Sequence, residues 1–230
     1  MELNNAVALV TGANRGLGRH VARQLVERGA KVYGAARHPE SVDVPGVVPL
    51  RLDVTDETSV REAARTASDV TLLINNAGIS TGATLIGGDV AEVRREMETN
   101  FFGPLTVTRA FAPVIEGNGG GAVLNVLSAL SWLHPAGLGS YAASKAAAWA
   151  LTGATREELA PRGIAVSALH VGYMDTDMAA GVPADQKVAA TDVAAQALDG
   201  IAAGLPEILA DDASRYVKQS LSAAHQPATD

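Results

Sequence analysis

The sequence predicts a single α/β domain, a doubly wound and mostly parallel seven-stranded sheet with helices on both faces. Seven short aliphatic runs alternate with longer, alanine-rich segments of helical pattern, which is typical of parallel strands joined by helical crossovers. With 230 residues, the chain is long enough for one sizeable core and needs no second domain. The strands are expected at Ala6 to Val10, Lys31 to Ala35, Val47 to Leu52, Thr71 to Ile74, Ala122 to Leu127, Ile164 to Leu169 and Glu207 to Leu209.

The first crossover shows the helical period most clearly. Leu17, Val21 and Leu25 recur at four-residue spacing on one helical face, and Gly29 follows as the expected stop. The same alternation continues to about residue 210, which favours crossover helices on both faces of the sheet. Beyond it, Asp211 to Ala223 has the pattern of a short amphipathic helix. We expect one domain over residues 1–224 and a flexible tail over residues 225–230.

Composition excludes several classes of protein. The chain is 47% hydrophobic and 19% charged, which is too apolar for disorder, and no apolar run reaches the about 18 residues of a membrane helix. The formal net charge of -7 argues against nucleic acid and anionic membranes as partners. The absence of cysteine excludes a disulfide scaffold, a thiolate zinc site and a cysteine nucleophile. Because the N-terminus has no basic stretch ahead of an apolar one, we expect a cytoplasmic protein.

A glycine-rich turn separates the first strand from the first helix. In Thr11-Gly12-Ala13-Asn14-Arg15-Gly16-Leu17-Gly18, the glycines permit a tight turn and let backbone amides approach a pyrophosphate at the helix N-terminus. A glycine pattern alone is more often a simple turn. Its position after an apolar strand and before an amphipathic helix favours a dinucleotide site.

Tyr141 and Lys145 lie four residues apart in an alanine-rich helical segment, which puts the phenol and the ammonium group on one helical face. The ordinary pKa of tyrosine is about 10. A positive charge beside the phenol favours the phenolate and would lower this pKa. Taken alone, the spacing also fits a packed tyrosine beside a solvated lysine. Upstream, Ser128 ends the fifth strand at the sheet edge where such folds bind ligands, with Ser131 as an alternative.

The glycine-rich turn, the Asn75-Asn76-Ala77-Gly78 segment and Tyr141-Ala142-Ala143-Ser144-Lys145 together resemble the classical short-chain dehydrogenase/reductase family. The resemblance covers about residues 5 to 205 and implies a Rossmann-type fold. Val171 stands where the family usually has proline, which affects the loop shape more than the chemistry. The family's usual Val-Asp-Gly-Gly ending is absent.

The resemblance implies four catalytic residues. Ser128 would polarise the substrate carbonyl, Tyr141 would exchange its proton with the substrate oxygen, and Lys145 would support the tyrosine. Asn100, within Glu98-Thr99-Asn100-Phe101-Phe102-Gly103, matches the family's asparagine, which holds a water that links the lysine to bulk solvent.

Two arginines indicate which cofactor is used. At the end of the second strand, where an acidic residue would meet a free ribose 2′-hydroxyl, the chain has Arg37, and Arg15 lies in the turn. Together they favour NADP(H) over NAD(H), although each alone could be a solvated surface residue. Asp53 matches the family's adenine-binding aspartate and could instead cap the helix that follows. The expected cofactor-binding residues are Gly12, Asn14, Arg15, Gly16, Leu17, Gly18, Arg37, Asp53, Val54, Asn76, Ala77, Gly78, Tyr141, Lys145, Gly172 and Thr176.

We expect an NADPH-dependent carbonyl reductase that acts on a neutral, hydrophobic ketone or aldehyde with Tyr141 as general acid. The alternatives are an NAD(P)-dependent alcohol dehydrogenase working in the oxidative direction and a non-catalytic NADP-binding sensor. Neither His134 nor His170 has the spacing of a metal pair, so we expect structural histidines and no metal. The expected substrate pocket is mostly apolar and consists of Leu130, Trp132, Leu138, Tyr173, Met174 and Met178.

A homodimer or homotetramer is also expected, because the family commonly pairs the helices that carry the asparagine and the tyrosine. The apolar residues that fit such a face are Ala146 to Leu151 with Trp149, and Phe101, Phe102, Leu105 and Phe111. Ordinary packing on the sheet could account for many of them.

Overall fold

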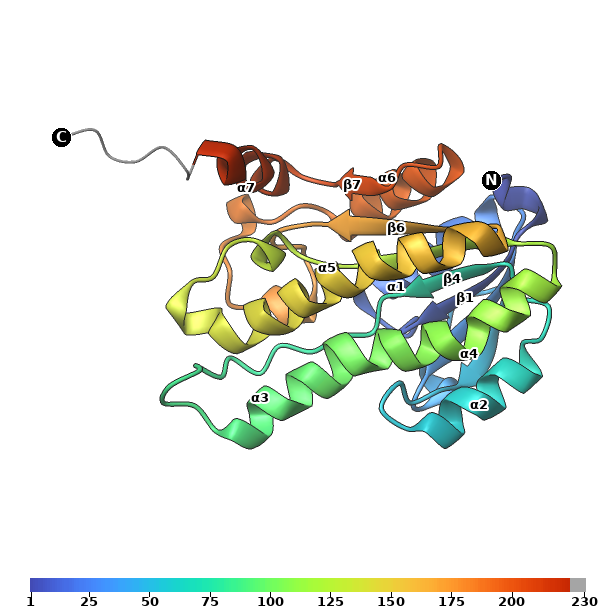
Figure 1. The fold of residues 1–230 in the computed structure, drawn as a ribbon, viewed down its shortest axis with the longest axis horizontal. Coiled ribbons are helices and arrows are strands. Elements are labelled where there is room, and N and C mark those ends of the chain that lie inside the picture. Colours follow the sequence, from blue (N-terminus) through green and yellow to red (C-terminus); the bar gives the residue numbers. More distant parts are fainter. Residues whose placement is uncertain (224–230) are drawn as a thin grey trace.

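The protein is an α/β fold in which one parallel sheet separates two layers of helices (Figure 1). The computed structural model describes residues 1–223, so the expected tail at residues 225–230 and the last residue of the expected domain lie outside it. Across the described residues the seven strands follow the order β3-β2-β1-β4-β5-β6-β7, and every neighbouring pair is parallel. The strands are β1 Val7–Thr11, β2 Lys31–Ala36, β3 Val47–Arg51, β4 Leu72–Asn75, β5 Gly121–Val126, β6 Ile164–His170 and β7 Glu207–Leu209.

The expected fold is confirmed, with strand ends displaced by one residue at several places. For example, β4 ends at Asn75 rather than Ile74, because Asn75 still pairs with Asn125 of β5. The helices are α1 Gly16–Glu27, α2 Glu57–Thr66, α3 Val90–Met97, α4 Gly103–Gly117, α5 Gly139–Leu159, α6 Ala190–Ala202 and α7 Asp212–Ala223. The last of these confirms the short helix expected near the C-terminal end.

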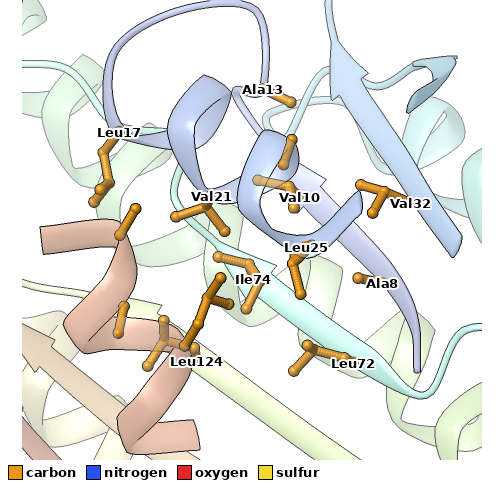
Figure 2. Packing of buried hydrophobic residues seen from close by; sticks show 14 of the residues in the cluster. Ala8, Val10, Ala13, Leu17, Val21, Leu25, Val32, Leu72, Ile74 and Leu124 are labelled. Carbon is orange, nitrogen blue, oxygen red and sulfur yellow. The ribbon is translucent and has the colours of Figure 1, made fainter. Parts of the chain in front are cut away.

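Alternating strand residues supply the two apolar layers of the core. Ala8 and Val10 of β1 belong to the layer under α1 and α6, whereas Leu9 faces the layer under α2 and α4. Figure 2 shows Val21 and Leu25 of α1 beside Val10 and Ile74 of the sheet, while Leu17 lies next to the red-brown helix α6. The four-residue spacing read from the sequence therefore marks the buried face of α1 and fixes this helix over the start of the sheet.

Helices α3 and α4 form one long rod that is interrupted by a π-helical turn at Glu98–Phe102 (Figure 1). Such turns widen a helix by one residue and occur often at functional sites. Asn100 lies in this turn with its side chain buried. The irregularity therefore changes the direction in which the helix presents Asn100.

The strand order reverses between β2 and β4, which both pair with β1. In doubly wound sheets, ligands bind outside the carboxyl ends of the strands at such a switch point. The glycine-rich turn follows β1 at this edge, and Asn76 follows β4. No helix among the described residues is long and apolar enough to cross a membrane.

Candidate active site

The glycine-rich turn is locked to the segment after β4 by hydrogen bonds. Thr11 Oγ1 accepts from the backbone amides of Asn76 and Ala77, both at 3.0 Å, and Asn76 Nδ2 donates to the carbonyl of Thr11 at 2.8 Å. At Gly18 an added Cβ would lie 2.3 Å from the carbonyl oxygen of Gly12. Glycine at position 18 therefore lets the start of α1 lie close to the glycine-rich turn.

The turn has the backbone conformation that an anion site requires. Gly12 and Gly16 have φ values of 67° and 52°, in the left-handed region that glycine adopts without strain. Within the described residues, no side chain caps the start of α1 and no acidic residue lies in its first turn. The amides and the positive end of the helix dipole are thus suited to a pyrophosphate. Asn14 is half-buried, and Leu17 is buried in the core.

The segment after β6 passes over this turn. Thr176 lies close to Gly16, since a Cβ on Gly16 would be 3.4 Å from the Thr176 methyl group. Arg15 Nη1 lies 3.6 Å from Asp177 Oδ2, and both side chains are exposed. The structure therefore brings Arg15, Gly16 and Thr176 together, with an acidic neighbour beside Arg15 that the sequence did not suggest.

Arg37 follows β2 and is exposed at the same edge of the sheet. Asp53 lies beyond the end of β3, where its Oδ1 accepts from the backbone N–H and the hydroxyl of Thr55 at 3.0 and 2.7 Å. The cap of α2 is Asp56, which accepts from the amide of Thr58. Asp53 is therefore not the helix cap, and its alternative role as an adenine-binding residue stays a prediction. Val54 packs against Gly103, where an added Cβ would be 3.0 Å from its methyl group.

Ser128, Tyr141 and Lys145 converge from β5 and α5. Ser128 follows β5, and its side chain hydrogen-bonds with the Tyr141 side chain. Lys145 Nζ lies 5.7 Å from the Tyr141 ring centroid and donates to the carbonyl of Val126 at 2.9 Å. Ser131 Oγ instead accepts from the backbone amide of Ser128 at 3.4 Å. Of the two serines, Ser128 is the one that contacts the tyrosine.

Burial governs the charge states of the tyrosine and the lysine. It raises the pKa of Tyr141 to about 12, with the hydrogen bond to Ser128 lowering it and the nearby charge of Glu96 raising it further. Burial also lowers the pKa of Lys145 to about 8. The expectation that Lys145 brings the tyrosine pKa toward neutrality is therefore wrong for the protein by itself, because the low-polarity surroundings disfavour both charged forms. At neutral pH Tyr141 keeps its proton.

Asn100 holds the backbone that follows the Asn75-to-Gly78 segment. Its Oδ1 accepts from the amide of Ile79, and its Nδ2 donates to the carbonyl of Ile79 and to Ser144 Oγ, each at 2.9 Å. Gly78 lies between Asn100 and Lys145, since an added Cβ would be 3.1 Å from Asn100 Oδ1 and 3.7 Å from Lys145 Nζ. Asn100 thus connects the β4 edge to α5, beside the lysine.

Two buried carboxylates near the site were missed by the sequence analysis. Asp211 Oδ2 accepts from the backbone N–H of Gly172 at 2.6 Å. Glu96 Oε1 accepts from the hydroxyl of Thr81 at 3.0 Å, while its Oε2 has no hydrogen-bond partner among the described residues. Acidic residues are mostly exposed, and nothing in the local pattern of either one indicates burial.

The residues expected to line the substrate pocket separate into two groups. Tyr173 and Met178 are exposed and Leu130 and Leu138 half-buried, so all four can reach a ligand. Met174 packs against the core. Trp132 is also buried, with its ring stacked on His170 at 3.8 Å and 17°, so both side chains contribute to packing rather than to an open pocket wall.

An apolar groove with a volume of about 720 Å³ lies beside the first turns of α5. Ala136, Gly137, Gly139 and Ala143 line one side, with His134 at its rim. The other side is formed by Thr84, Leu85 and Ile86 of the segment between β4 and α3, which the sequence analysis did not associate with a binding surface. Within the described residues, no cluster of His, Asp and Glu could hold a metal ion.

Comparisons with known proteins agree with this geometry. A family model described as short chain dehydrogenase matches residues 6–187. The chain is 34% identical over 200 residues to the 3-oxoacyl-(acyl-carrier-protein) reductase FabG of Vibrio harveyi, covering 82% of each protein. It is 36% identical over 229 residues to the cis-4-hydroxycyclohexanecarboxylate dehydrogenase of Sinomonas cyclohexanicum, covering 92% of this chain and 91% of the relative.

Solved structures give the same result. A short chain dehydrogenase from Burkholderia cenocepacia J2315 in complex with NADP is similar to this chain with a TM-score of 0.93 and 40% identity. That match covers 97% of this chain and 95% of the other. A short chain dehydrogenase/reductase from Burkholderia phymatum in complex with NAD matches with a TM-score of 0.86 and 26% identity, covering 100% and 99%. Relatives of this fold thus include proteins with either nicotinamide cofactor bound.

Proposed function

The chain belongs to the short-chain dehydrogenase/reductase family, and on this basis we propose that it is an NADPH-dependent carbonyl reductase. The observation that carries the proposal is the contact between Ser128 and a tyrosine that stays protonated at neutral pH. Tyr141 hydrogen-bonds with Ser128, and burial raises its pKa to about 12. A protonated phenol is prepared to give a proton to a carbonyl oxygen, whereas oxidation of an alcohol requires the phenolate. The protonated phenol is thus the form that the proposed reduction uses.

The bound cofactor would supply the hydride. Ser128 donates a hydrogen bond to the substrate carbonyl and orients it toward Tyr141, which transfers its proton to the oxygen as negative charge develops there. Lys145 stabilises the resulting phenolate through its charge. Asn100 fixes the backbone at Ile79 and the position of Ser144 on α5, and so keeps the helix that carries Tyr141 and Lys145 in place.

Two exposed arginines at the switch-point edge support NADPH as the cofactor. Arg37 follows β2, and Arg15 lies in the glycine-rich turn. Guanidinium groups bind a 2′-phosphate by charge-assisted hydrogen bonds. The similar Burkholderia cenocepacia protein has NADP bound.

The proposed substrate is a neutral, hydrophobic ketone or aldehyde. No lysine or arginine occurs in residues 128–144 or 170–186, and the groove beside α5 is lined mostly by apolar atoms. An anionic substrate left unpaired in such surroundings would cost several kcal/mol, about 2 or more. The similar Vibrio harveyi enzyme is named for a substrate attached to a carrier protein, so carrier-bound substrates belong in the test as a comparison.

The oxidative direction is the second candidate, because the similar Sinomonas cyclohexanicum protein is named as a dehydrogenase of a hydroxy compound. Oxidation of NADPH over a panel of aryl and medium-chain ketones and matched keto acids, together with reduction of NADP⁺ over the corresponding alcohols, tests both directions. A higher kcat/KM for the hydrophobic ketones supports the proposal. A higher value for the keto acids contradicts the substrate class, and turnover only of alcohols with NADP⁺ contradicts the direction.

A further inference from the structure

Behind Ser128, a buried histidine contacts the backbone of the serine. His170 is the last residue of β6, its side chain is fully buried, and its Nδ1 lies 3.1 Å from the carbonyl oxygen of Ser128. Since a carbonyl oxygen only accepts hydrogen bonds, Nδ1 carries the ring proton and donates it. Burial lowers the pKa of His170 to about 4, so the ring is neutral at neutral pH. The single ring proton is thus used to hold Ser128.

The ring of His170 is covered by Trp132, which is itself contacted by residues of α5 and α7. The ring of Trp132 stacks on His170, with centroids 3.8 Å apart and an angle of 17° between the planes. Lys218 of α7 places its Nζ 4.7 Å from the Trp132 ring and pairs with Glu207 of β7 at 2.9 Å. Trp149 of α5 contacts the edge of the same tryptophan. A continuous line of contacts therefore runs from α7 through Trp132 and His170 to Ser128.

Helix α7 is itself fixed close to the site. Asp211 accepts from the backbone N–H of Ser214 at 2.8 Å, which caps the helix, and from Gly172 at 2.6 Å. Gly172 lies two residues beyond His170. The residue before α7 is thus tied to Gly172, and Lys218 of α7 lies over the ring that stacks on His170.

We propose that His170 and Trp132 are positioning residues that hold Ser128 in the orientation its hydrogen bond to the substrate requires, and that α7 holds them in place. This inference rests on the proposed function, in which Ser128 orients the carbonyl. The Ser128 carbonyl also accepts from the amide of Ser131 at 3.0 Å, and its hydroxyl accepts from the amide of Leu130 at 3.1 Å. Rotation of the Ser128 peptide would disturb these bonds and move the hydroxyl. A displacement of about 1 Å at a reacting group can lower a rate by about a hundredfold.

Two substitutions at position 170 separate the hydrogen bond from the stacked ring. His170→Phe keeps an aromatic ring for Trp132 but has no donor, whereas the Nδ2 of His170→Asn can occupy the position of Nδ1 and donate to Ser128. We expect His170→Phe to lower kcat about tenfold or more and His170→Asn, which restores the donor but loses the stack, to recover part of that loss. NADPH affinity, measured by the fluorescence of the bound cofactor, should change less than about twofold in both.

Two further comparisons test the part that the stack of Trp132 on His170 plays. Trp132→Leu removes the stack, and we expect it to lower kcat, while Trp132→Phe should retain most of the activity. Tyr216→Ala lies on α7, where its side chain is 72% exposed, and should leave kcat and cofactor affinity unchanged. Equal kcat values for Trp132→Leu and Trp132→Phe would contradict the role of the stack.

A double-mutant cycle with Ser128→Ala distinguishes positioning from general destabilisation. If His170 acts through Ser128, adding His170→Phe to Ser128→Ala causes no further loss of kcat. Independent, multiplicative losses, or a folded His170→Phe variant with kcat within about twofold of the parent, would overturn the inference. Should His170→Phe not fold, the same cycle with Trp132→Leu decides. If Ser128→Ala alone retains full activity, the proposed function fails instead, and the two failures are therefore distinguishable.

Discussion

The carboxylate of Asp211 accepts a hydrogen bond from the backbone N–H of Gly172 at 2.6 Å. Gly172 begins the segment that passes over the glycine-rich turn, and Asp211 lies directly before α7. Asp211 lies beyond residue 187, where the match to the family model ends. A residue beyond the family-model match therefore fixes the segment that passes over the glycine-rich turn.

Replacing Asp211 should loosen the segment that begins at Gly172. Asp211→Ala removes acceptors for the amides of Gly172 and Ser214, and hydrogen bonds to a charged group contribute roughly 1.5 to 3 kcal/mol each. We expect a lower free energy of unfolding in urea and a KM for NADPH that rises more than kcat falls. Asp212→Ala is the matched control, because that neighbouring side chain is fully exposed. Unchanged stability and KM in Asp211→Ala would show that the hydrogen bond between Asp211 and Gly172 does not fix this segment.

Cofactor preference should depend on Arg37. With Arg15 and Arg37 on the 2′-phosphate, the parent protein should prefer NADPH by an order of magnitude or more, since each charge-assisted bond contributes roughly 1.5 to 3 kcal/mol. Arg37→Asp should weaken or reverse the preference. Arg65→Ala, an exposed arginine in the last turn of α2, is the control. Equal kcat/KM for NADH and NADPH in the parent would contradict the assignment of the two arginines.

Acid should destabilise the protein partly through His170. Burial lowers its pKa from 6.5 to about 4, so between these values the unfolded chain binds the proton that the folded protein excludes. The stability contributed by the neutral ring is present above about pH 6.5 and is lost as the pH falls through about 4, by up to about 3 kcal/mol. His170→Phe lacks this group. Urea unfolding at pH 7 and pH 4.5 should show a smaller loss for the variant than for the parent, and an equal loss would contradict the burial of a neutral histidine.

Self-association should use the outer face of α4, α5 and the π-helical turn. Phe102 and Trp149 are 44% and 40% exposed, and Figure 1 shows α4 and α5 side by side on one side of the sheet. Light scattering at micromolar concentration should give a dimer or a tetramer, and Phe102→Lys should lower the mass. A monomeric mass for the parent would reject the prediction.

Local spacing predicted the glycine-rich turn and the shared helical face of Tyr141 and Lys145, and the resemblance to the family supplied the roles of Ser128 and Asn100. Gly12, Gly16 and Gly18 are required by a turn that joins neighbouring elements, and Tyr141 and Lys145 face the same side because they lie one helical turn apart. These relationships depend on residues close in sequence. The parallel, doubly wound sheet followed in the same way from the alternation of strand and helix patterns.

The features that the sequence could not predict depend on contacts between segments that are distant in sequence. For Phe111 the sequence left open an association face and packing on the sheet, and the structure shows packing, because Phe111 is fully buried in the core layer under α4. His170 and Trp132 come together from different segments. The high pKa of Tyr141 has the same origin, since burial depends on the packing of segments that are remote in sequence.

The central claim is that Tyr141 gives its proton to a substrate carbonyl. The direct measurement is kcat for NADPH-dependent reduction of a hydrophobic ketone by the parent and by Tyr141→Phe, with NADPH affinity and thermal stability measured on both. The substitution removes one hydroxyl and keeps the ring, so folding and cofactor binding should be retained. We expect kcat to fall about 10²- to 10⁴-fold, as is typical for the loss of a general acid. A folded variant that binds NADPH and keeps kcat within about threefold of the parent would contradict the claim.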